Sequence, residues 1–133
     1  MSRNSRVLYI GFLLIIVMGL LHLSAELFYL YWVYWWFDWS VHFLAGFSGG
    51  LVTYWVLADS GLWRVSRKPD WVYTTLVFVC VMIVGVGWEI FEYTNNLTDS
   101  YERLYSIDVA SDLIFDAVGA LLTVPISRLL KSF

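Results

Sequence analysis

The sequence predicts an all-α membrane protein, a bundle of four transmembrane helices with both termini on the cytoplasmic side. Three observations predict this class. Hydrophobic residues make up 60% of the 133 residues and charged residues only 14%, whereas about half of a soluble domain is apolar and about a quarter is charged. The apolar residues fall into runs of membrane-spanning length. The basic residues are separated along the chain from most of the acidic ones. We expect one integral membrane domain over residues 1–133.

Four spans are expected at about residues 7–26, 39–58, 71–94 and 108–130. Each is long enough, because about 20 residues at a rise of about 1.5 Å cross a hydrocarbon core of about 30 Å. The first follows a basic leader, but Leu23-Ser24-Ala25 lacks a small residue at its first position, which favours an uncleaved span over a signal peptide. A turn-rich, basic connection separates the second and third spans. Pro125 predicts a kink near the inner end of the fourth.

The basic residues predict the orientation. With the N-terminus inside, seven of the eight are cytoplasmic: Arg3, Arg6, Arg64, Arg67, Lys68, Arg128 and Lys131. Only Arg103 falls outside, so the positive-inside rule favours cytoplasmic N- and C-termini. We therefore expect a multi-pass protein of the plasma membrane, which in a bacterium is the inner membrane.

The connection between the first two spans, residues 28–39, is saturated with aromatic side chains and has no basic residue. Tyrosine and tryptophan concentrate where an apolar ring meets hydrated headgroups, so this segment is expected to lie along the outer interface. A platform that stacks on carbohydrate or lipid is one interpretation, and an ordinary aromatic belt is the favoured one.

Acidic residues and both histidines gather at the outer ends of the spans. They are Glu26, Asp38, Glu89, Glu92, Asp108, Asp112 and Asp116, with His22 and His42. The last three aspartates step by four and therefore form one stripe along the fourth helix. His22 and Glu26 are four apart, as are Asp38 and His42, while Glu89 and Glu92 are three apart, so every helix contributes a polar face.

So many carboxyl groups cannot all stay ionised side by side. Insertion scales give an aspartate at a helix centre a cost of roughly 2.5–3.5 kcal/mol. Like charges about 4–6 Å apart repel by roughly 3–4 kcal/mol at an effective dielectric constant near 20. Either some of the acids hold protons or cations lie among them.

Each group has a structural interpretation beside the functional one. His22 and Glu26 are close enough to the headgroups to be a solvated pair, and whether they belong to the site stays open. Asp38 and His42 have the spacing of two metal ligands or of a carboxylate–histidine hydrogen bond. Asp112, inside its span, is typical of a functional residue that faces the bundle interior, as is Asp116. The glycines are predicted to allow close contact between helices: Gly46, Gly49, Gly50, Gly85, Gly87 and Gly119.

Three motifs follow one another in the chain: Asp38-x-x-x-His42-Phe43, Glu89-x-x-Glu92 and Asp112-x-x-x-Asp116-x-x-Gly119. In order and internal spacing they resemble the VanZ-like membrane proteins and the similar YjdF-type inner-membrane proteins. Glu92 stands where VanZ-like chains carry glutamine, and Asp116 where they carry asparagine. The resemblance implies a small multi-span protein, associated in the VanZ case with low-level teicoplanin resistance and therefore with the cell envelope. It supplies no reaction.

Two functions remain beside a purely structural polar seam. In the first, an outward-facing pocket binds a divalent cation and acts on a lipid headgroup or a lipid-linked cell-envelope precursor, as a metal-dependent hydrolase or transferase. The expected ligands are Asp38, His42, Glu89, Asp112 and Asp116. Glu89 or Glu92 would be the general base, and Mg²⁺, Mn²⁺ or Ca²⁺ is favoured over Zn²⁺, with iron as a further candidate. In the second, the same acids bind cations, protons or a ligand without covalent chemistry.

The orientation can be tested with reporter fusions. Alkaline phosphatase fused after Phe133 is expected to be inactive because it stays in the cytoplasm, whereas phosphatase inserted in the connection after Thr94 is expected to be active. The opposite pattern of activities would show that the acidic ends face the cytoplasm.

Overall fold

The structure is a computed structural model that describes residues 3–62, 68–95, 97 and 105–132, with side chains from Ser5 onward. Arg64, Arg67 and Arg103 and the side chain of Arg3 lie outside the described residues. The elements, in chain order, are α1 (Arg3–Phe28), α2 (Leu30–Val33), α3 (Phe37–Ala58), α4 (Asp70–Thr94) and α5 (Tyr105–Ser132). All but α2 are long and apolar enough to cross a membrane, which confirms the all-α fold with four spanning helices. The cytoplasmic location of both termini stays a prediction.

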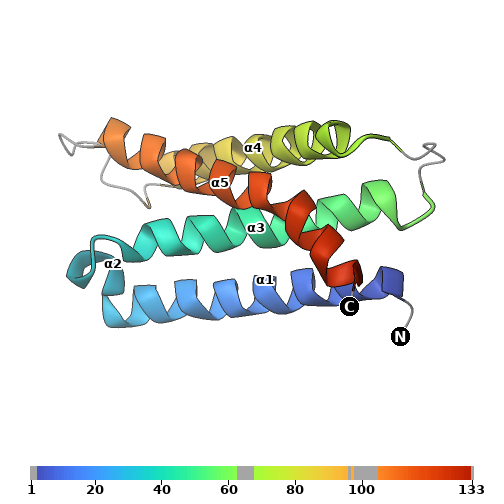
Figure 1. Ribbon diagram of the computed structural model, residues 1–133. Helices are drawn as coiled ribbons and strands as arrows, with labels where there is room; N and C mark the ends of the chain where they lie inside the picture. The colour runs from blue at the N-terminus through green and yellow to red at the C-terminus, as the bar shows by residue number, and fades with distance from the viewer. Residues whose placement is uncertain (1–2, 63–67, 96, 98–104, 133) are drawn as a thin grey trace.

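Each long helix contains its expected span and extends beyond it at one or both ends. The extensions are physically reasonable because a helix keeps its backbone hydrogen bonds as it passes from hydrocarbon into the headgroup region. Pro125 lies inside α5, and the C-terminal part of that helix bends toward α1 (Figure 1). Proline removes one backbone donor and crowds the preceding turn, which accounts for the bend.

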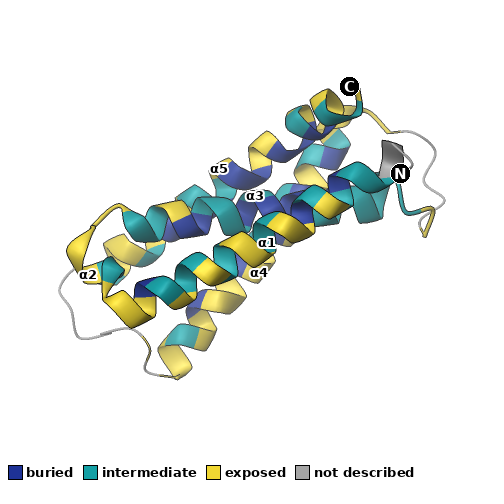
Figure 2. Cartoon of the chain, turned by 90° about the horizontal axis from the view of Figure 1, so that it is seen from below, coloured by how far each residue is buried: buried dark blue, intermediate teal, exposed yellow. Residues whose placement is uncertain are grey.

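Helix α3 is central and packs against α1, α4 and α5 (Figure 1). It packs most extensively against α5, and buried residues are concentrated on these two helices (Figure 2). Helices α1 and α4 both lie against α3, but their backbones stay apart: among the described residues no Cα atom of α1 comes within 8 Å of one in α4. The bundle is therefore open along one side.

The close packing of α3 on α5 depends on glycine. A Cβ atom added at Gly46 would clash with the backbone carbonyl of Asp116, and one added at Gly119 would lie 2.5 Å from the carbonyl oxygen of Phe43. Gly50 and Gly85 also face neighbouring helices closely, as predicted. The prediction is wrong for Gly49 and Gly87, whose added Cβ atoms would meet nothing within 4 Å. Spacing along one helix cannot show which glycine faces a neighbour and which faces open space.

The end of the bundle where both termini lie (Figure 1) also carries the described basic residues, which are Arg6, Lys68, Arg128 and Lys131. Arg128 Nη2 lies 2.5 Å from Asp70 Oδ1, and Lys131 pairs with Asp59. The Lys131 ammonium also lies 4.5 Å from the centre of the Tyr54 ring. The two acids at this end therefore have basic partners, unlike the acids at the opposite end.

The aromatic connection folds back over the acidic end. Tyr29 has a left-handed backbone, with φ 57°, which ends α1 and allows the chain to reverse into the short helix α2. Trp32, Trp35 and Trp36 are exposed, as expected for side chains at a membrane interface.

Gly46→Ala is expected to lower the free energy of unfolding by about 1–3 kcal/mol, because the added methyl group forces α3 away from α5. Thermal or denaturant unfolding in detergent micelles measures the change. Gly87→Ala is the matched control, and it should leave stability unchanged or raise it, since its methyl group meets open space and alanine favours helix. Equal effects at both positions would contradict the close α3–α5 contact.

Candidate functional site

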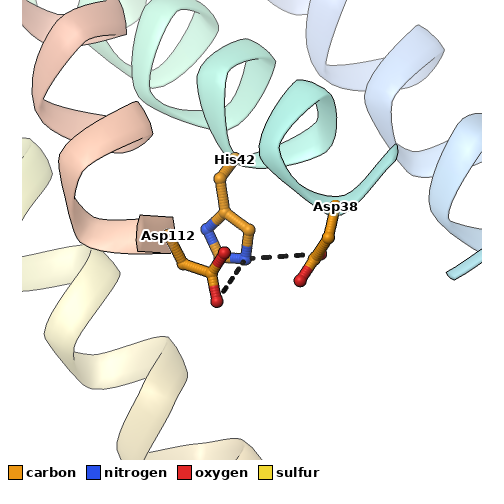
Figure 3. Close-up of side chains that lie close together, drawn as sticks. All are labelled: Asp38, His42 and Asp112. Atoms are coloured by element: carbon orange, nitrogen blue, oxygen red, sulfur yellow. Dashed lines mark ion pairs between the residues drawn. The ribbon is translucent and has the colours of Figure 1, made fainter. Parts of the chain in front are cut away.

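His42 is the centre of the acidic cluster. It lies on α3, one turn after Asp38, and its ring reaches toward α5 (Figure 3). Its Nε2 atom lies 3.7 Å from Asp38 Oδ1 and 3.9 Å from Asp112 Oδ2. Its Nδ1 atom lies 3.4 Å from Asp116 Oδ2, a hydrogen-bonding distance. The imidazole is therefore held among three aspartates that come from two helices.

The side of the ring that carries Nε2 can hold a cation. One ligand atom from each of Asp38, His42 and Asp112 lies within 4.8 Å of the other two. Two carboxylate oxygens and one imidazole nitrogen form a donor set suited to hard or intermediate divalent cations. The other interpretation of the same geometry is a protonated imidazole that attracts all three carboxylates and holds α3 to α5.

Two carboxyl groups in this region are buried without complete hydrogen bonding. Asp112 is 4% exposed and Glu89 is 7% exposed. Asp112 Oδ1 and Glu89 Oε1 have no hydrogen-bond partner among the described residues. A buried polar atom without a partner costs about 1–3 kcal/mol, and more if it is charged. Both groups therefore destabilise the fold unless a further ligand completes their bonding.

A cavity of about 870 Å³ opens beside Asp112. Its polar end is lined by acids and histidines from all four long helices: His22, Glu26, Asp38, His42, Glu92, Asp108, Asp112 and Asp116. Its volume is in the upper part of the range of about 300–1,000 Å³ that is usual for small-molecule sites. Glu89 is buried on α4 and is not among the residues that line the cavity.

His22 belongs to the wall of this cavity. Its Nδ1 atom lies 2.7 Å from the hydroxyl oxygen of Tyr31, and its ring meets Trp88 edge-on, with ring centres 5.9 Å apart. Burial, and next the negative charge of Asp38, raise the pKa of the Tyr31 hydroxyl above its usual range. Tyr31 therefore stays neutral and keeps a proton for this hydrogen bond. Glu26 is exposed on the turn of α1 that follows.

The structure brings together four of the predicted metal ligands, Asp38, His42, Asp112 and Asp116, around one imidazole. The fifth, Glu89, lies outside the group of three that could share an ion. Of the two predicted general bases, Glu92 lines the cavity and Glu89 does not. The roles of these residues as ligands and bases stay predictions.

Sequence reasoning missed Tyr31 and Trp88 as parts of the site. Tyr31 lies within the aromatic segment assigned to the membrane interface, where nothing separates it from its neighbours. Trp88 lies on α4 next to Glu89, and no periodicity pairs it with a histidine on α1. Only contacts between segments that are separate in the sequence show that Tyr31 and Trp88 belong to the site.

Over residues 1–132 the chain matches the family described as "Predicted membrane protein (DUF2238)". The chain belongs to this family. No curated protein and no solved structure matches it. The family description agrees with the four apolar helices and names no reaction. This match does not test the resemblance to VanZ-like proteins, which stays a prediction.

Glu89→Gln is expected to raise the free energy of unfolding by roughly 1 kcal/mol in protein kept in chelator at a pH where Glu89 is ionised, because a neutral amide is less costly to bury than an unpaired carboxylate. Thermal unfolding in detergent measures the difference. Glu26→Gln, at an exposed glutamate of the same end, should have no effect. Destabilisation by Glu89→Gln would instead mean that a partner compensates the Glu89 carboxylate.

Proposed function

We propose that the acidic cluster is an outward-facing divalent-cation site of a plasma-membrane protein, and that the bound cation serves chemistry on a lipid headgroup or lipid-linked cell-envelope precursor. Mg²⁺, Mn²⁺ or Ca²⁺ suits the donor set better than Zn²⁺, since two of the three close donors are carboxylates and no thiolate is present among them; iron fits as well. Both termini are cytoplasmic in this proposal, because the described arginines and lysines lie at their end of the bundle.

One observation carries the proposal: Asp38, His42 and Asp112 present ligand atoms within 4.8 Å of one another, and Asp112 keeps a second oxygen that is buried without a partner. Repulsion between carboxylates this close is relieved by a cation. The cavity beside Asp112 leaves space for water or a ligand to complete the coordination.

Asp116 supports this site through the opposite ring nitrogen. Its carboxylate accepts a hydrogen bond from Nδ1–H of His42, which leaves Nε2 unprotonated and directed toward Asp38 and Asp112. Metal-binding histidines usually have such a carboxylate partner, which fixes the tautomer and the ring orientation. Gly46 and Gly119 allow the backbone contact that brings Asp116 within reach of the ring. We therefore assign Asp116 a positioning role.

Glu92 is the better placed of the two candidate general bases. It is half-buried and lines the cavity that Asp112 and Asp38 share, so it can reach a ligand bound there. A general base must come within hydrogen-bonding distance of the proton that it removes, which favours Glu92 over the enclosed Glu89. A cation at the cluster would polarise a phosphoryl or carbonyl oxygen, as in a hydrolase or transferase. The VanZ-like order of the motifs supports a cell-envelope substrate.

Metal content tests the proposal. Protein purified without chelator is expected to hold one equivalent of divalent cation by elemental analysis, and Asp112→Asn and His42→Ala are expected to lose it. Asp116→Asn should retain it with an affinity lowered roughly 10–100-fold, as for other outer-shell partners. Glu26→Gln is the control at the same end of the bundle.

Stability provides a second measurement. Manganese at about 100 times its dissociation constant should raise the free energy of unfolding by about 2.7 kcal/mol, and EDTA should reverse the gain. A native protein that is free of metal and indifferent to EDTA would overturn the proposal and would favour the protonated His42 as a structural link between α3 and α5.

A further inference from the structure

The cavity beside the acidic cluster continues into an apolar groove. Its floor is formed by α3, where Ala45, Gly49 and Thr53 follow Asp38 and His42 along one face. At about 1.5 Å per residue, the floor runs about 12 Å beyond Ala45 toward the middle of the membrane. One wall is Met18 and Gly19 of α1; the other is Cys80, Val81 and Val84 of α4.

This groove is open to the hydrocarbon core. Helices α1 and α4 stand apart along the part of the chain that the structure describes, and their gap exposes the groove sideways. Val84, which lines the groove, is 71% exposed. Side chains bridge this gap at one level, where the His22 ring meets Trp88 edge-on. Met18 and Val84 of the groove lie one helical turn farther from the acidic end.

Two glycines keep the groove empty. A Cβ atom added at Gly49, on the floor, or at Gly19, on the wall, would meet no heavy atom within 4 Å. At Gly46, by contrast, the backbone of α5 already occupies the space that a Cβ atom would need. Both glycines line the cavity, so a larger side chain at either position would project into it.

The charges at the polar end of the cavity indicate how a lipid headgroup would bind there. Among the described residues, no lysine or arginine lines this cavity, whereas four aspartates and two glutamates do. These acids would repel a phosphate group unless a cation lay between them and the phosphate. Asp112 lines the cavity and has a buried oxygen that lacks a partner, which is the group such a cation would satisfy.

We infer that this site binds a phosphate-headed membrane lipid, which enters sideways between α1 and α4, places one hydrocarbon chain over Gly49 and Gly19, and brings its phosphate to the cation held by Asp38, His42 and Asp112. The inference rests on the proposed function and adds the class of lipid, its route into the protein and the position of its chain. The apolar groove and the acidic cluster form one continuous cavity, so a single amphiphile fits both.

Photo-crosslinking tests the position of the chain. The probe is phosphatidylglycerol with a diazirine in the middle of one acyl chain, in phosphatidylcholine vesicles with manganese present. Irradiation followed by peptide mass spectrometry is expected to place labels on Thr53, Cys80 and Val84 in excess over Leu13 and Ile83, which are exposed on the outer faces.

Three glycine variants form a matched set. Gly49→Leu and Gly19→Leu fill the groove and should reduce labelling of Cys80 to the level of the outer faces. Gly87→Leu adds the same side chain to an exposed, open position on α4 and should leave the labelling unchanged. Leucine favours helix over glycine at all three positions, and bound manganese measured in each variant shows that the cluster is intact.

A second probe tests the phosphate. Diacylglycerol with the same diazirine chain should label the groove less than phosphatidylglycerol does, and EDTA should remove the difference. Manganese binding together with even labelling of groove and outer faces, or with equal labelling by both probes, would overturn the inference and leave the proposed function standing. Absence of bound manganese in the unmodified protein would overturn the proposed function itself, and with it the cation on which the inference rests.

Discussion

The backbones of α3 and α5 lie in contact because glycine stands where they meet, at Gly46 and Gly119. This contact places Asp116 against Nδ1 of His42 and Asp112 against Nε2. A side chain at either glycine would push the helices apart and separate the imidazole from both carboxylates. The cluster, the cavity beside it and the functions assigned to them depend on this one steric requirement.

The acidic residues at the two ends of the bundle differ in whether they have partners. At the end with the termini, Asp59 and Asp70 have Lys131 and Arg128 as partners, so each charge is compensated within the fold. At the other end, Asp112 and Glu89 are buried with oxygens that lack partners. Carboxyl groups in that condition cost stability, and such a cost is typical of sites kept for binding or chemistry. The open side between α1 and α4 is the route by which we propose that a membrane lipid reaches that end.

Much of the fold could be predicted because the membrane imposes simple requirements on a chain. Backbone groups must be paired within each helix, and each apolar run must match the hydrocarbon thickness, so composition and run length predicted four spanning helices. The spacing of four also predicted that Asp38 would lie beside His42. It could not exclude Glu89 from the group around the imidazole, because the rotation of α4 relative to α3 depends on packing between the helices.

The sequence by itself determined a membrane protein of four helices with acids gathered at one end and bases at the other. Only the tertiary structure decided that the backbone of α5 packs directly against Gly46, while Gly49, less than one turn away, faces an open groove. It also decided that His22 contacts Tyr31 and Trp88. The physical reason is that hydrophobicity and helical period are properties of one segment, whereas contact and empty space depend on how separate helices are placed against one another.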